Sequence, residues 1–164
     1  MTQFHHFSHT QQNYLLIQLE TRMPQITDTM SADHKRCDEL FAQAEEAISK
    51  GDWETGATAF RDFHDATEKH FSMEESVLFP AFEQSTGMTS GPTQVMRMEH
   101  MQMRQLFADM GESVEEKDQE KYLGLSETLI MVMQQHNTKE EQIVYVMADQ
   151  SLREKAVDVL TQME

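Results

Sequence analysis

Apolar side chains recur every three or four positions along most of this chain, the spacing that places them on one face of a helix. The first clear run follows alternating steps of four and three: Met30, His34, Cys37, Phe41, Ala44 and Ile48. Gly51 follows this run and Asp52 is a good N-cap, so we expect a turn there and a second helix from about Trp53 to Gln84. The predicted inner face of that helix mixes apolar and polar residues: Phe60, Phe63, Thr67, His70, Glu74, Val77, Leu78 and Ala81. Pro80 is expected to kink its last turns.

The second half of the chain shows a similar pattern after a loop over residues 85–92. Pro92 suits the first turn of a third helix. The inner face of that helix is predicted to carry Met96, His100, Met103, Phe107 and Met110. We expect the polar stretch Gly111–Asp118 to form a turn. A fourth helix, at about residues 119–148, is predicted to bury Leu125, Leu129, Val132, His136, Glu140, Ile143 and Met147.

Four helices of this kind predict an all-α fold, an up-down-up-down four-helix bundle. Residues 1–26 are less regular and are interrupted by Pro24, so we expect an N-terminal arm or short helix there. Residues 27–164 are predicted to form the bundle domain, with a short C-terminal helix from Ser151. A chain of 164 residues is large enough for one such domain with its own core.

The two halves are related by an offset of 66 residues. The offset relates two pairs of histidines, each separated by 36 residues, and each second histidine precedes a glutamate by four: His34, His70 and Glu74, then His100, His136 and Glu140. It also relates residues outside these motifs: Leu40-Phe41-Ala42 to Leu106-Phe107-Ala108, and Asp52 to Asp118. We interpret the repeat as two related helical hairpins within one bundle.

The repeated histidines and glutamates predict a metal centre. Residues four apart lie on one face of a helix, so each second histidine points the same way as its glutamate. In the first hairpin, His34 and His70 lie at similar distances from the turn and return to about the same depth. A buried, unpaired carboxylate costs several kcal/mol, a cost that a metal ion removes. Imidazole and carboxylate together suit a pair of borderline-hard ions such as iron. The predicted metal ligands are His34, His70, Glu74, His100, His136 and Glu140.

Other polar residues have simpler interpretations. His64 and Glu68 share the spacing of four, but the repeat places Ile130 and Gln134 at their counterparts, so we expect His64 to be exposed. For three histidines in the arm we expect solvation, with an extra ligand as the alternative: His5, His6 and His9. Glu75 and Glu141 are expected to be solvated or salt-bridged, with a role as ligand or as hydrogen-bond acceptor of a ligand as the alternative.

The soft and sulfur-containing residues are expected to pack in the core. Cys37 is predicted to be a small core residue, with a redox or ligand role as the alternative. The methionines are predicted to be adaptable packing residues rather than copper ligands: Met96, Met103, Met110, Met131, Met133 and Met147.

Composition excludes several classes of function. The net charge of −16 repels phosphate backbones and anionic membranes. No apolar run approaches the roughly 20 residues of a spanning helix, and the N-terminus does not have the pattern of a signal peptide. A single cysteine excludes an intrachain disulfide and fits a cytoplasmic location. The chain contains no Cys-x-x-Cys, no glycine-rich phosphate loop and none of the Glu-x-x-His motifs of ferritin-like bundles.

These motifs resemble those of the hemerythrin family, specifically bacterial proteins with an HHE cation-binding domain. The resemblance covers about residues 28–150 and rests on Asp33-His34, His70-Phe71-Ser72-Met73-Glu74-Glu75 with Leu78-Phe79-Pro80, Gly91-Pro92 with Met96 and Glu99-His100, and His136 through Glu140-Glu141. It implies a four-helix bundle with a non-haem di-iron centre, bridged by an oxo or hydroxo group and by carboxylates. In this resemblance the four histidines match terminal ligands, while Glu74 and Glu140 match the bridging carboxylates.

The chain departs from the oxygen-carrying hemerythrins in two respects. Those proteins have a fifth histidine one turn from the third-helix ligand, whereas Met96 and Arg104 flank His100 here at that spacing. Their last carboxylate is an aspartate five residues after its histidine, the position of Glu141 here. These differences argue against stable oxygen carriage and leave a coordination position open. The four-histidine, two-glutamate set also resembles iron–sulfur-cluster repair proteins that respond to nitric oxide, but we find no counterpart of their cysteine-containing N-terminal domain.

We therefore expect a cytoplasmic di-iron protein that binds or senses a small oxidant, namely O2, NO or peroxide. The alternative is a stress-response protein that repairs iron–sulfur clusters or turns over NO or peroxide. We expect a metal- and small-ligand-binding protein rather than a conventional enzyme, with zinc or manganese as the alternative metals. The expected partner is a diatomic or peroxide ligand, without nucleic acid or membrane, and the expected assembly is a monomer or homodimer.

Overall fold

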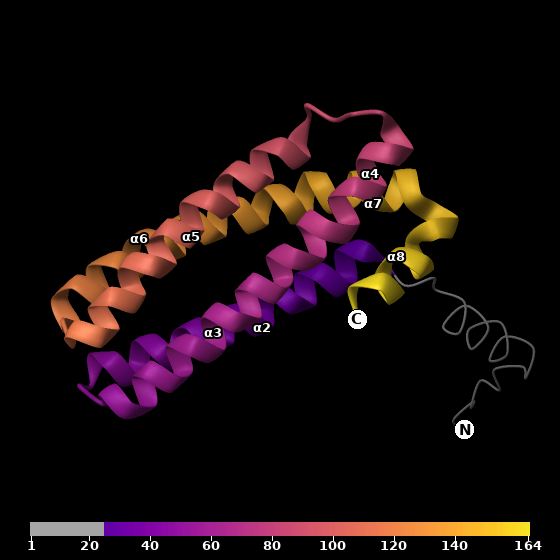
Figure 1. Ribbon diagram of the computed structural model, residues 1–164. Helices are drawn as coiled ribbons and strands as arrows, with labels where there is room; N and C mark the ends of the chain where they lie inside the picture. The colour runs from indigo at the N-terminus through magenta and orange to yellow at the C-terminus, as the bar shows by residue number, and fades with distance from the viewer. Residues whose placement is uncertain (1–24) are drawn as a thin grey trace, which may run out of the picture.

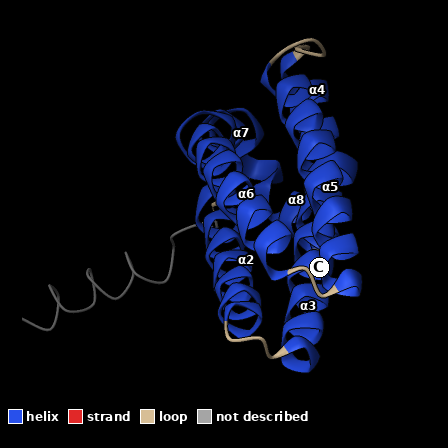
Figure 2. Cartoon of the chain, turned by 90° about the vertical axis from the view of Figure 1, so that its left-hand side faces the viewer, coloured by secondary structure: helices blue, strands red, loops and turns tan. Residues whose placement is uncertain are grey.

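The computed structural model describes residues 25–164, and every regular element in that part of the chain is helical. The predicted all-α class is therefore confirmed, and Figure 2 shows the described chain as helices joined by loops and turns. The predicted N-terminal arm, residues 1–26, lies outside the described residues except for its last two positions. No helix of the described part is long and apolar enough to cross a membrane.

Four long helices make up the body of the bundle: α2 (Ile26–Ser49), α3 (Trp53–Met73), α5 (Pro92–Glu116) and α6 (Gln119–Lys139). Helix α2 packs along α3, and α5 packs along α6 (Figure 1). The short turn within each of these pairs lies at the same end of the bundle, at the left in Figure 1. The other end of the bundle therefore carries the long connection that precedes α5.

The turns follow from local sequence signals. Gly51 has a φ of 75°, a left-handed conformation that glycine adopts without steric cost. The Asp52 carboxylate then accepts a hydrogen bond from the Thr55 N–H at 3.1 Å and caps α3. Asp118 caps α6 in the same way, accepting from the Lys121 N–H at 3.0 Å. The two hairpins thus use equivalent N-caps at equivalent positions of the repeat.

The prediction of a turn over Gly111–Asp118 is wrong, because α5 continues to Glu116. A glycine inside a helix costs only about 1 kcal/mol relative to alanine, and buried side chains on both sides of it continue the inner face. The chain turns instead at Lys117, which has a φ of 55°. The longer helix makes the ascent from His100 match the descent to His136, so both histidines reach the same level of the bundle.

The second and fourth predicted helices are each interrupted by one π-helical turn. These turns and the helices that follow them are η1 (Glu74–Leu78) with α4 (Phe79–Thr86), and η2 (Glu140–Val144) with α7 (Tyr145–Leu152). The Phe79 N–H donates to the carbonyl of Glu74, five residues earlier. In the same way the Tyr145 N–H donates to the carbonyl of Glu140. Both interruptions therefore begin at the glutamate of the repeated motif.

Each π turn contains an additional residue and so rotates the helix face that follows it. Ile143 was predicted on the inner face and is 50% exposed, whereas Val144 and Tyr145 are buried. Pro80 lies in the first turn of α4, directly after η1. The second repeat makes the same π turn with Val146 at the equivalent position, so the proline is not the cause of the interruption.

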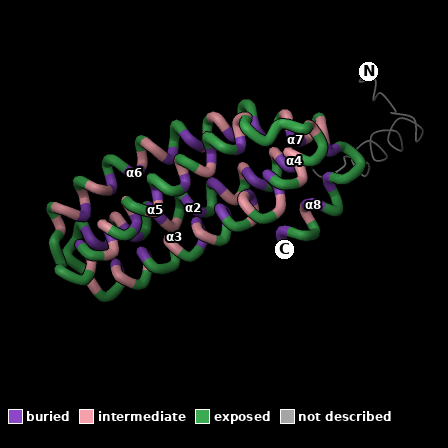
Figure 3. The backbone as a smooth tube through the Cα atoms, turned by 45° about the horizontal axis from the view of Figure 1, so that its top comes forward, coloured by how far each residue is buried: buried purple, intermediate pink, exposed green. Residues whose placement is uncertain are grey.

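Two apolar clusters fill the bundle on either side of the predicted ligands, and Figure 3 shows buried positions along the inner sides of the helices. The cluster towards the hairpin turns includes Phe41, Phe63, Phe107, Tyr122 and Leu129. The opposite cluster includes Met30, Leu78, Phe79, Phe82 and Tyr145. The predicted methionine packing is wrong for Met131, which is 62% exposed on the outer face of α6.

The C-terminal segment closes one end of the bundle. The expected short helix begins later than Ser151, because η3 (Arg153–Lys155) precedes α8 (Ala156–Met163). Asp149 in α7 accepts hydrogen bonds from the Ile26 N–H at 2.7 Å and from the Thr27 hydroxyl at 2.6 Å. This carboxylate therefore caps the first turn of α2 and ties the two ends of the described chain together.

Two helical glycines should respond in opposite directions to alanine. A Cβ at Gly56 would lie 2.5 Å from Cγ1 of Ile48, which is itself fully buried, so Gly56→Ala should destabilise the fold by about 1–2 kcal/mol. A Cβ at Gly124 meets nothing within 4 Å, so Gly124→Ala should stabilise by about 0.5–1 kcal/mol. Urea unfolding of the three proteins measures both effects. Equal stability changes would contradict the close α2–α3 contact.

Candidate metal centre

The structure brings all six predicted ligands into one buried layer in the middle of the bundle. They come from four long helices and from the first positions of the two π turns: His34, His70, His100, His136, Glu74 and Glu140. None of the six is more than 5% exposed. Residues that are far apart in the sequence are thus gathered in one compact cluster of nitrogen and oxygen atoms, away from solvent.

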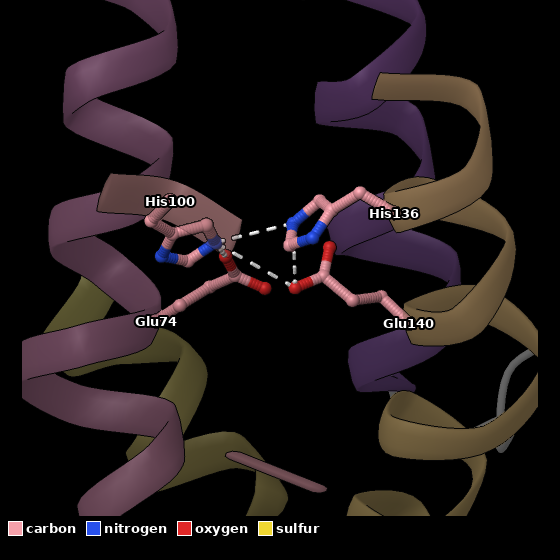
Figure 4. Close-up of side chains that lie close together, drawn as sticks. All are labelled: Glu74, His100, His136 and Glu140. Carbon is pink, nitrogen blue, oxygen red and sulfur yellow. Dashed lines mark hydrogen bonds and ion pairs between the residues drawn. The ribbon is translucent and has the colours of Figure 1, made fainter. Parts of the chain in front are cut away.

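The cluster divides into two groups of possible ligand atoms that share one residue. Within each group the atoms lie within 4.8 Å of one another. The first group, whose side chains point towards one another in Figure 4, is Glu74, His100, His136 and Glu140. The second group is His34, His70 and Glu140. Because Glu140 belongs to both, the arrangement has the form of two adjacent sites joined by a carboxylate.

Each histidine ring is oriented from outside by its own carboxylate. The Nδ1 atoms make these contacts: His34 to Glu141 at 2.8 Å, His70 to Asp33 at 2.9 Å, His100 to Glu75 at 2.8 Å and His136 to Glu99 at 2.9 Å. The repeat relates Asp33 to Glu99 and Glu75 to Glu141. Carboxylate–histidine pairs of this kind fix the ring and raise its basicity towards a metal.

These outer contacts determine what the rings present to the interior. An ionised carboxylate only accepts, so Nδ1 carries the hydrogen, and Nε2 of a neutral ring presents a lone pair inward. Nε2 of His100 lies 3.1 Å from Nε2 of His136 and 3.2 Å from Oε2 of Glu74. Oε2 of Glu74 and Oε1 of Glu140 are buried and have no hydrogen-bond partner. Acceptors therefore face acceptors, an arrangement that a cation between them stabilises, so the residues fit a metal centre.

The electrostatics of the layer favour positive charge. Burial alone would lower the pKa of His100, but the adjacent Glu140 and Glu74 outweigh it and raise the pKa to about 9. The pKa of His34 is also raised, because Glu140 and Glu141 outweigh the effect of burial. For Glu140, burial would raise the pKa, but three histidines hold it well below its ordinary value. The buried carboxylates thus attract a cation to this position.

Three of the four outer carboxylates also pair with a basic side chain. Asp33 pairs with Arg36, Glu75 with Arg104 and Glu99 with Lys139. No lysine or arginine of the described chain pairs with Glu141, and the repeat places Asp38 where the first-mentioned pattern has Arg104. The pKa of Asp38 is raised by burial and by the charge of Glu141. The surroundings of His34 are therefore more negative than those of the other three histidines.

Aromatic rings shield the first group of ligands from water. The Phe71 ring is stacked on the His100 ring, with centroids 3.9 Å apart and an interplanar angle of 17°. Phe79 lies on the other apolar cluster, with its centroid 6.0 Å from that of His100. Both phenylalanines are buried. A dry environment strengthens the electrostatic interactions within the layer.

Sequence reasoning missed three residues of this layer. Asp33 and Glu99 entered only through the family resemblance, although the acidic residue before each first histidine is repeated and was the available signal. Tyr145 was missed because the π turn at Glu140 rotates it inward. Its hydroxyl donates a hydrogen bond to Glu74 Oε1 at 2.7 Å and lies 3.1 Å from Glu140 Oε2. Burial and these carboxylates raise the pKa of Tyr145, so the phenol keeps its proton.

The remaining predicted residues lie away from the layer or play outer roles. The His64 side chain is 41% exposed and contacts the neighbouring Asp65, so it is separate from the cluster. Cys37 is buried at 4% exposure, in agreement with a packing role. Glu75 and Glu141 accept hydrogen bonds from ring nitrogens, which is the alternative role considered for them. The three histidines at positions 5, 6 and 9 lie outside the described residues.

A helical bundle with a buried histidine–glutamate cluster defines this chain as a metal-binding helical protein. The chain belongs to the hemerythrin family: the family model described as the hemerythrin HHE cation binding domain matches residues 25–148. This match confirms the resemblance inferred from the sequence motifs. Searches among curated proteins and among solved structures found no match.

The outer carboxylates should control metal affinity. Glu75→Gln removes the negative acceptor of the His100 ring and should weaken zinc binding by about 10- to 100-fold. Glu68→Gln is the matched control, because Glu68 shares Arg104 with Glu75 but contacts no ligand histidine in the printed hydrogen bonds. Competition titrations with a chromophoric chelator measure both. Equal weakening in the two variants would show that Arg104, and not the Glu75–His100 bond, is responsible.

Proposed function

We propose that this protein is a cytoplasmic non-haem di-iron protein that binds or senses a small oxidant, such as O2, NO or peroxide. One observation carries the proposal. Oε2 of Glu74 and Oε1 of Glu140 are buried without hydrogen-bond partners, in a layer where histidine nitrogens point inward. The cost of several kcal/mol for such groups is relieved by metal ions. The family's cation-binding domain supports the same conclusion.

Two ions are supported by the grouping of the ligand atoms. The two groups share Glu140, so one carboxylate can bridge neighbouring ions. A set of four imidazoles and two carboxylates suits iron better than copper, which favours soft sulfur ligands, and zinc and manganese are the alternatives. When bound, a pair of irons supplies redox-active metal to which a small oxidant can coordinate.

The residues around the layer suit a ligand-binding role. The six predicted ligands are fewer than two octahedral ions require, so coordination positions remain for a small molecule. Phe71 and Phe79 keep the layer dry, and the outer carboxylates hold the rings in place. The chain therefore combines fixed ligands with space for an external one. Turnover of NO or peroxide, or repair of iron–sulfur clusters, is the alternative that the oxidant experiment below tests.

We also propose the finer features of fold and assembly. The offset of 66 residues supports an up-down-up-down bundle made of two related hairpins. The net charge of −16 supports an assembly without nucleic acid or anionic membrane, as a monomer or homodimer. A cytoplasmic location is supported by the lone cysteine, Cys37, which is buried and forms no disulfide.

Metal analysis is the direct test. Protein purified without added metal should contain about two irons per chain, as the two overlapping groups require. His70→Ala and His136→Ala should each lose most of the iron, since each removes a ligand from one group. His64→Ala should retain it, because His64 is half-exposed and distant from the cluster. Stoichiometric zinc, or iron that survives both ligand substitutions, would contradict the proposal.

Oxidant binding can be separated from turnover by spectroscopy. Anaerobically reduced protein should give a new, stable absorption spectrum when O2 or NO is added, because coordination positions remain free on the metals. The His136→Ala protein should show no such change. Multiple turnovers of the added oxidant would instead favour the enzymatic alternative, and an unchanged spectrum of the iron-loaded protein would contradict oxidant binding altogether.

A further inference from the structure

Tyr145 places a phenol oxygen inside the ligand layer. The side chain is fully buried, at 0% exposure, and comes from the first position of α7. Its Oη donates a hydrogen bond to Glu74 Oε1 at 2.7 Å and lies 3.1 Å from Glu140 Oε2. It also lies 3.2 Å from His34 Nε2 and 3.4 Å from His70 Nε2. A single oxygen atom thus contacts four of the six predicted ligands.

These contacts coincide with the smaller of the two ligand groups. The group around His100 has four members, whereas the other has only three, His34, His70 and Glu140. The Tyr145 oxygen lies within 3.4 Å of all three. We propose that Tyr145 is the fourth protein ligand of the metal ion held by this smaller group. The proposal rests on the metal centre of the proposed function.

The chemistry of this step balances without an oxidant or reductant. In the metal-free protein the phenol O–H donates to a buried carboxylate. When a metal ion binds, a metal–oxygen bond forms, the O–H bond breaks and the proton passes to solvent, and no electrons are transferred. A bound cation favours the deprotonated form of its ligand, and phenolate is a known protein ligand of ferric iron.

The repeat makes this oxygen specific to one of the two metal positions. The counterpart of Tyr145 at the offset of 66 is Phe79, whose ring centroid lies 6.0 Å from that of His100. Phe79 has the same position after its π turn but carries no oxygen. The two halves therefore offer unequal coordination, with one phenolate at the metal of His34 and His70 and none at the other. Two inequivalent metal ions follow from this difference.

A zinc titration tests the ligation independently of iron and of activity. Zinc has no visible spectrum, so an ultraviolet difference spectrum reports phenol ionisation directly. Wild-type protein should show ionisation of one phenol per chain on loading, and Tyr145→Phe should show none. Tyr122→Phe is the matched control, because Tyr122 is equally buried but lies in the other apolar cluster. Tyr145→Phe should also bind its weaker zinc ion roughly tenfold less tightly.

Iron loading provides a second readout. Wild-type ferric protein should show a visible phenolate-to-iron absorption, which Tyr145→Phe should lose and Tyr122→Phe should keep. Two bound metals without phenol ionisation in the wild-type protein would overturn the ligand assignment while leaving the proposed function intact. Failure to bind zinc or iron would overturn both. Should Tyr145→Phe not fold, the wild-type and Tyr122→Phe spectra alone decide, since a difference spectrum without phenol ionisation in both refutes ligation.

Discussion

The structure depends on two carboxylates that the fold buries completely. Glu74 and Glu140 each have an oxygen without a hydrogen-bond partner, in a layer where imidazole nitrogens point inward. In a bundle with apolar clusters above and below, such groups are unfavourable unless positive charge accompanies them. The raised pKa of His100 expresses the same demand, since the carboxylates there stabilise a cation. Folding and metal binding are therefore coupled in this chain, and the ligand layer is the reason why the core is polar at its centre.

The duplicated hairpin turns this local demand into a symmetric scaffold. Asp33 holds a ring of its own hairpin, the one of His70, and Glu99 does the same for His136. The other two outer carboxylates act across the hairpins, with Glu75 on His100 and Glu141 on His34. The rings thus tie all four long helices together at one level. The repeat is broken where Arg104 has the acidic counterpart Asp38 and where Tyr145 has the counterpart Phe79, so the two halves share a scaffold but differ in charge and in donors.

Much of this arrangement could be predicted from the sequence, because helical periodicity and the repeated spacings are local signals. The run from Met30 to Ile48 is buried as predicted, and the six predicted ligands meet in one layer. The failures have a common cause in backbone geometry. Periodicity assumes 3.6 residues per turn, so it placed Ile143 inside and overlooked Tyr145 once a π turn had shifted the face. Likewise a lone glycine at position 111 resembled a turn, although the apolar face continues beyond it.

The π turns themselves are best explained by the site rather than by helix propensity. Both begin at a predicted ligand, Glu74 or Glu140, and their i+5 hydrogen bonds start from the carbonyls of these same residues. One repeat has a proline two residues after the turn and the other has Val146, so no shared helix breaker accounts for both. Without the additional residue, the faces before and after the glutamate would be continuous, and Phe79 and Tyr145 would rotate out of the core. The widened turn keeps histidine and glutamate four residues apart on one face while it directs the next aromatic side chain under the ligand layer. Metal ligation and core packing therefore make opposing demands on one helix, and the π turn reconciles them.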